Sequence, residues 1–81
     1  MPTVLRESGF RVVIYTRDEH PPAHVHVWRA EGEVVIRLGG TGELPSLREV
    51  NGMPKRDVRR ALDLVTAHQD ILLTRWEEIN G

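Results

Sequence analysis

The chain has 81 residues, of which 40% are hydrophobic and 28% are charged, a composition typical of one folded domain rather than a disordered segment. It contains no cysteine, which excludes disulfides, thiolate zinc sites and iron–sulfur clusters and fits a reducing cytosol. The formal net charge is −1 with neutral histidines, so no overall field draws the chain to nucleic acid or to a membrane. Met1-Pro2-Thr3-Val4 lacks the features of a signal peptide and no apolar run could span a bilayer, so we expect a cytoplasmic protein.

The first half of the chain predicts a small antiparallel sheet. Runs of β-branched and aromatic residues, separated by turn residues, predict three to four strands, at residues 3–5, 10–16, 24–29 and 33–38. Glu31-Gly32 is expected to form the turn between the last two of these strands. Consecutive prolines place residues 18–23 in a loop, because proline cannot join a central ladder. Residues 44–50 fit either a short strand or a single helical turn.

The second half of the chain predicts a helix. Asn51-Gly52 breaks the chain, and Pro54 sits where the first turn of a helix tolerates proline. Apolar residues then recur at helical spacing, namely Val58, Leu62, Val65, Leu72, Trp76 and Ile79. The sequence therefore predicts a single α+β domain over 1–81, with a sheet part at 1–44 and one long C-terminal helix at 53–80.

The predicted helix has an unusually wide apolar surface. It covers roughly 200° of the helix circumference, whereas packing on one sheet needs little more than about 100°. The additional apolar positions are Ala61, Leu64, Ile71 and Leu73. They are either a few exposed aliphatic side chains, which are normal on proteins, or a surface that docks a second copy or a different protein.

Three of the four histidines, His20, His24 and His26, fall within seven residues. Residues i and i+2 of a strand point to the same face, so the imidazoles of His24 and His26 are expected to project side by side. His20 would approach from the loop, and Asp18 and Glu19 could supply a carboxylate ligand or orient an imidazole. Neutral imidazoles suit a divalent transition metal such as zinc or nickel. The alternative is that these histidines have structural or pH-sensitive roles.

The start of the predicted helix is basic, since it carries Lys55, Arg56, Arg59 and Arg60. Cations normally favour the other end of a helix. If Pro54 is the first helical residue, Met53 occupies the N-cap and offers no oxygen to the free amides. Unfilled amides beside several cations predict an anion-binding site, with phosphate as the candidate ligand. The alternative is a solvated face whose cations pair with Glu43, Glu49 or Asp63.

Four features of the sequence together form the pattern of a known protein family. They are an opening Met1-Pro2-Thr3-Val4-Leu5, a Gly9-Phe10-Arg11 entry to a strand, Tyr15 before the histidine-rich loop, and a helix that ends near Trp76. The chain resembles, over nearly its whole length, the small bacterial proteins of the domain of unknown function 4160 family. Residues 19–27 are the most specific part, although the family usually has two prolines directly before the middle histidine and this chain has Pro21-Pro22-Ala23. No catalytic residues are established for the family that could be carried over to this chain. Family members are similar in context to small paired genes of the toxin–antitoxin type, so the resemblance implies a protein partner.

These features lead to a first hypothesis, a small interaction module of toxin–antitoxin-like type with a His20/His24/His26 site for one divalent metal. Its partner would be a second small protein or a second copy, docked on the apolar helix face. The alternative is a metal- or histidine-dependent ribonuclease or phosphoesterase, in which Arg56, Arg59 or Arg60 would stabilise phosphate charge. Nucleic-acid binding is the third hypothesis.

Overall fold

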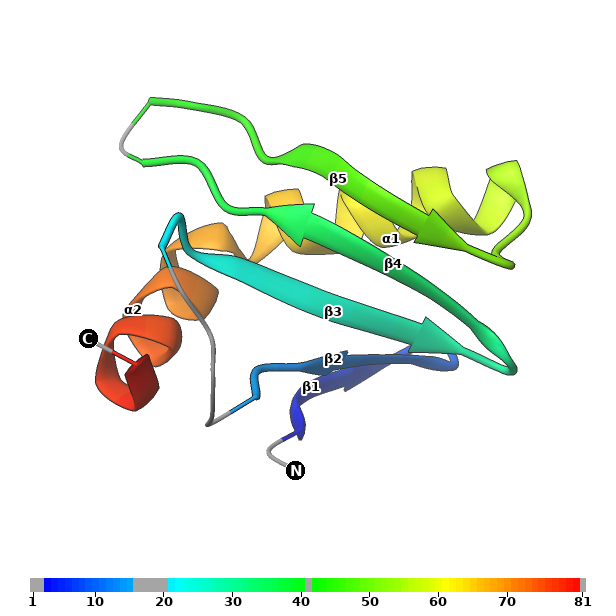
Figure 1. Cartoon of the computed structure of the whole chain (residues 1–81), viewed down its shortest axis with the longest axis horizontal. Helices are drawn as coiled ribbons and strands as arrows, with labels where there is room; N and C mark the ends of the chain where they lie inside the picture. The colour runs from blue at the N-terminus through cyan, green and yellow to red at the C-terminus, as the bar shows by residue number, and fades with distance from the viewer. Residues whose placement is uncertain (1–2, 16–20, 41, 81) are drawn as a thin grey trace.

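The computed structural model of the chain describes residues 3–15, 21–40 and 42–80, which contain five strands and then two helices (Figure 1). The strands are β1 (Thr3–Glu7), β2 (Phe10–Val13), β3 (His24–Arg29), β4 (Gly32–Arg37) and β5 (Ser46–Asn51). The helices are α1 (Lys55–Ala67) and α2 (Gln69–Asn80). The strands form one antiparallel sheet in chain order, which confirms the α+β class.

The sheet described by these residues has five strands rather than the three to four that the sequence predicts. The additional strand is β5, whose residues fitted either a strand or a helical turn. β5 pairs with the outer edge of β4, from Glu33 opposite Asn51 to Arg37 opposite Ser46. The buried backbone groups of β4 need hydrogen-bond partners on both sides, and pairing with β5 provides them on the outer side. Residues 46–51 therefore form a strand although their intrinsic strand preference is weak.

The turn between β3 and β4 lies one residue earlier than the sequence predicts. Arg29 pairs with Gly32, so Ala30 and Glu31 form a two-residue turn, in which Ala30 has a φ of 52°. Gly32 is instead the first residue of β4, and a Cβ atom there would lie 2.9 Å from both the Gly52 oxygen and the Met53 Cα atom. Glycine at this position therefore allows residues 52–53 to pass closely over the strand on their way to α1.

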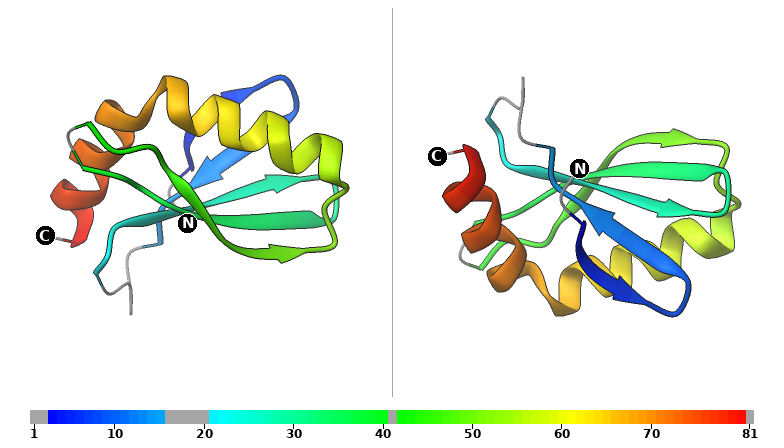
Figure 2. Two further views of the ribbon diagram at one scale, coloured as in Figure 1. Left: turned by 90° about the horizontal axis from the view of Figure 1, so that it is seen from above. Right: turned by 90° about the horizontal axis from the view of Figure 1, so that it is seen from below.

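The hydrophobic core lies between one face of the sheet and α1, which crosses behind β4 and β5 in Figure 1 and lies on one side of the sheet in both views of Figure 2. The sheet contributes mainly β-branched side chains without solvent exposure, namely Val12, Ile14, Val25, Val27, Val34 and Ile36. α1 contributes Val58, Ala61, Leu64 and Val65. Among the described residues, neither helix covers the middle of the opposite face of the sheet (Figure 2).

The expected single helix over 53–80 is two helices, because the chain leaves the helical conformation at His68 (φ −120°, ψ 17°). The His68 amide donates to the Val65 oxygen at 3.1 Å and its Nδ1 atom donates to the Leu64 oxygen at 3.0 Å, which satisfies carbonyls at the end of α1. The side chain of Gln69 accepts a hydrogen bond from the Gly39 amide and donates one to the Glu43 oxygen, both at 2.8 Å. The loop after β4 thus holds the junction between the helices.

The break at His68 allows most of the apolar residues that were predicted to form a wide surface on one straight helix to be buried. Because α2 takes a new direction around the end of the sheet, Leu72 and Trp76 are buried in the same core as Ala61 and Leu64 (Figure 2). Ile71 remains 64% exposed. Neither of the two helices is long and apolar enough to serve as a membrane span within the described residues.

The close approach at Gly32 predicts that Gly32→Ala destabilises the fold by about 1–3 kcal/mol, since the new methyl group would collide with backbone atoms that cannot move independently. The free energy of unfolding in urea measures this effect. Gly40→Ala is the matched control, because its Cβ atom would meet only the carboxylate end of Glu43, at 3.3 Å. Equal losses in the two variants would contradict the role assigned to Gly32.

Candidate functional site

The structure brings His24 and His26 together on β3. Their ring centroids lie 5.4 Å apart, with the ring planes at 63°. Val25 and Val27, which alternate with them, belong to the core beneath α1. Side chains of a strand alternate between its two faces, so both imidazoles lie on the face opposite α1.

Both imidazoles use the Nδ1 atom in a hydrogen bond with the protein. His24 Nδ1 lies 3.0 Å from the Pro22 carbonyl oxygen, and His26 Nδ1 lies 2.9 Å from Glu33 Oε2. A carbonyl and a carboxylate can only accept, so each Nδ1 carries the proton, and Nε2 carries the lone pair in the neutral ring. Histidines that bind metals are commonly oriented in this way, by a carbonyl or carboxylate on the other ring nitrogen.

Glu33 is a residue of this site that the sequence analysis did not identify. It lies on β4 opposite Trp28, one diagonal step from His26 on the same face of the sheet. Its Oε1 atom accepts a hydrogen bond from Asn51 Nδ2 at 3.2 Å, and the same Asn51 nitrogen donates to Glu49 Oε2 at 2.7 Å. A row of polar groups therefore runs from His26 across β4 to the end of β5.

Aromatic rings enclose the imidazole pair. The ring of Tyr15 meets the His26 ring edge-on, with centroids 4.6 Å apart, and Trp76 of α2 lies 6.4 Å from the His24 ring. Asn80, at the end of α2, donates to the Tyr15 carbonyl oxygen at 3.2 Å. His24 is consequently buried, whereas His26 is half-buried and is the more accessible of the two.

The remaining residues of the predicted metal site, Asp18, Glu19 and His20, lie outside the described residues. Within residues 3–15, 21–40 and 42–80, no three histidine or carboxylate side chains are close enough together to hold an ion. The Nδ1 atom of His68, at the break between α1 and α2, donates to the Leu64 oxygen. The described part of the site therefore offers two imidazoles and one carboxylate, and the carboxylate orients His26.

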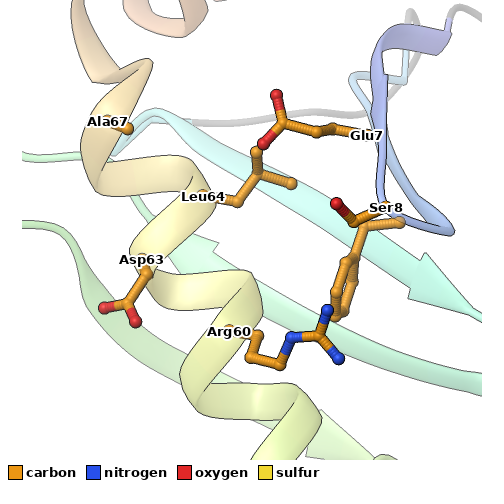
Figure 3. A pocket seen from close by; sticks show the side chains of 7 residues that line it. Glu7, Ser8, Arg60, Asp63, Leu64 and Ala67 are labelled. Atoms are coloured by element: carbon orange, nitrogen blue, oxygen red, sulfur yellow. The ribbon is translucent and has the colours of Figure 1, made fainter.

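The basic residues at the start of α1 separate into two groups. Lys55, Arg56 and Arg59 line a groove between α1 and β5. Arg60 lines a different cavity of about 290 Å³, where its guanidinium lies 5.6 Å from the centre of the Phe10 ring and reaches toward the β1–β2 turn (Figure 3). The four cations therefore do not form one cluster.

The N-terminus of α1 also differs in detail from the sequence analysis. Pro54, not Met53, is the N-cap residue, and no side chain caps the helix. In the described part of the chain, no ion pair joins Glu43, Glu49 or Asp63 to the basic residues of α1. Asp57 pairs with Arg29 instead, with 3.6 Å between Oδ2 and Nε.

The Glu33 contact predicts the outcome of a tautomer measurement. Glu33→Ala removes the acceptor of the His26 Nδ1 proton, so the neutral His26 ring should become a mixture of its two tautomers while His24 stays unchanged. The ¹⁵N chemical shifts of the ring nitrogens report this change. Glu31→Ala, in the exposed turn, is the control and should alter neither ring. An unchanged His26 spectrum in Glu33→Ala would contradict the assignment.

Comparison with known proteins agrees with the resemblance found in the sequence. No curated protein and no solved structure gives a significant match to the chain. One family model, described as Domain of unknown function (DUF4160), matches residues 9–77, which include β2 to β5, both helices apart from the last residues of α2, and the imidazole pair. The chain therefore belongs to the DUF4160 family.

Proposed function

We propose that this protein is a small interaction module, one component of a toxin–antitoxin-like pair, that binds a divalent transition metal through His24 and His26. The single observation that supports the metal site is the pair of oriented rings. Each Nδ1 atom donates to a protein oxygen, at 3.0 Å in His24 and 2.9 Å in His26, so Nε2 would be the nitrogen of each ring that binds the metal.

The chemistry of the pair favours zinc or nickel, since both ions accept imidazole nitrogen. Structural zinc sites are closed by four protein ligands, whereas sites with fewer protein ligands keep positions open for water or another molecule. Two imidazoles leave such positions open, with Asp18, Glu19 and His20 as further candidate ligands outside the described residues. An open metal site suits an interaction module, because a partner can complete the coordination.

Titration of the metal-free protein with zinc or nickel chloride tests this proposal. We expect saturable binding of one ion, with shifts of the His24 and His26 ring nitrogens. Either His24→Ala or His26→Ala should abolish binding, and Glu33→Gln should weaken it by about 10–100-fold, because the residue orients a ligand.

The control for this titration is His68→Ala, which removes an imidazole that donates to the Leu64 oxygen. It should leave the affinity unchanged. If the native protein does not bind either ion, or if His68→Ala loses as much affinity as His26→Ala, the metal proposal is wrong.

The His26–Glu33 hydrogen bond favours a second candidate function, a histidine-driven ribonuclease or phosphoesterase. A carboxylate that fixes the Nδ1 proton leaves Nε2 able to accept a proton from a hydroxyl nucleophile. The His24 ring, 5.4 Å away, would serve as the second proton-transfer group. The rate of cleavage of a short RNA should then fall by about 10²–10⁴-fold in His26→Ala, while the circular dichroism spectrum remains native.

A chelator separates the two chemical roles in the RNA assay. Cleavage that persists with chelator indicates histidine catalysis, and cleavage that stops indicates a metal-assisted reaction. Cleavage that His26→Ala leaves unchanged would come from a contaminating nuclease and would remove the support for an enzyme.

A further inference from the structure

An open groove of about 920 Å³ runs between β5 and α1, on the face of the sheet opposite the imidazole pair. Its lining is mostly apolar, with Leu47, Val50, Met53, Val58 and Leu62, and it also includes charged side chains of α1. Leu47 is 47% exposed and Val50 is 45% exposed, although both point toward the helix side of the sheet. Apolar side chains that remain half exposed in a groove are typical of a binding surface.

β5 forms the wall of this groove and is an edge strand. It is the last strand of the sheet, so its outer backbone groups have no neighbouring strand within residues 3–15, 21–40 and 42–80. All six of its residues are exposed. Such an edge can accept an extended segment as an additional strand, with main-chain hydrogen bonds for affinity and neighbouring pockets for specificity.

The charge around the groove selects the kind of segment that fits. Lys55, Arg56 and Arg59 line it, against one carboxylate, that of Asp63. Arg48 is the extra residue of an irregularity in the pairing of β4 with β5 and adds a cation on the strand itself. In the described part of the chain, none of these four cations forms an ion pair. Charge complementarity therefore favours an acidic occupant.

A second copy of the chain fits the groove less well. Antiparallel pairing of two β5 strands would set Leu47 opposite Val50 and Arg48 opposite Glu49, which is locally complementary. The two-fold axis of such a dimer, however, stands perpendicular to the sheet and places both α1 helices on the same face. The basic residues that line the two grooves would then approach one another and repel.

We propose that the groove binds an extended segment of another protein that carries both apolar side chains and carboxylates. The backbone of this segment pairs with β5 as a further strand. Its apolar side chains cover Leu47, Val50 and Leu62, and its carboxylates meet Lys55, Arg56 and Arg59. This inference deepens the interaction part of the proposed function, and it does not depend on the metal site because the imidazoles lie on the other face.

Nuclear magnetic resonance titration of the full chain tests this inference. The probe is a capped synthetic peptide of six residues, the length of β5, in which glutamate and valine alternate. Addition of the peptide should change the chemical shifts of residues in β5 and on the facing side of α1. The amide protons of β5 should also exchange more slowly with solvent. The same peptide with lysine in place of glutamate should not bind.

Two substitutions and one control test whether the peptide binds in the groove between β5 and α1. Arg59→Glu should weaken binding of the glutamate peptide about tenfold, because an attraction becomes a repulsion, and Leu47→Ala should weaken it through the loss of apolar contact. Arg37→Glu makes the same charge change on an exposed residue of β4, which follows the core residue Ile36 and so faces away from the groove. This control should bind as the native chain does.

Three outcomes would overturn the inference. They are equal binding of the glutamate and lysine peptides, perturbations that miss β5, and a native chain that dimerises in sedimentation analysis with protected β5 amides, which would assign the groove to a second copy. His26→Ala should still bind the peptide. In the native chain, peptide binding without metal binding would overturn the metal proposal alone. Metal binding without peptide binding would overturn only the groove proposal.

Discussion

The pleat of β3 determines which face of the sheet carries the imidazoles. Val25 and Val27 are fully buried beneath α1, and alternation along the strand then directs His24, His26 and Trp28 to the opposite face. A one-residue shift in register would expose the valines, at a cost of roughly 1.5–3 kcal/mol for each, and would bury the imidazoles in the core. Ordinary hydrophobic packing therefore positions the candidate site.

The pairing of His24 with His26 could be predicted from the sequence because it depends only on the period of a strand. The contact of His26 with Glu33 could not, because it depends on register. A turn at Glu31-Gly32 would have paired Trp28 with Val35 and moved Glu33 out of reach, whereas the observed turn at Ala30-Glu31 pairs Trp28 with Glu33. The sequence suggested Gly32 as the turn residue, but the fold uses this glycine where residues 52–53 cross β4.

The α+β class, the boundaries of β3 and the family could be predicted from the sequence, because strong residue patterns and a specific motif indicate them. The helix break could not, because no local feature of the sequence indicates it. At His68 and Gln69 there is no glycine or proline, and the apolar spacing continues into α2. The break coincides with two hydrogen bonds of the Gln69 side chain, which accepts one from the Gly39 amide and donates one to the Glu43 oxygen. Such contacts are tertiary, so a periodic pattern of apolar residues cannot reveal them.

The two proposed surfaces lie on opposite faces of the sheet, yet one hydrogen-bonded row connects the imidazole pair with β5, the strand that forms the wall of the groove. Asn51 is the last residue of β5, and its side chain donates to Glu33, whose other oxygen accepts the Nδ1 proton of His26. A segment added to β5 would restrain the strand that carries Asn51. Restraint of Asn51 would favour a single position of the Glu33 carboxylate, and that carboxylate sets the tautomer of His26. An occupied β5 edge would therefore stabilise the orientation of His26 that metal binding or proton transfer requires.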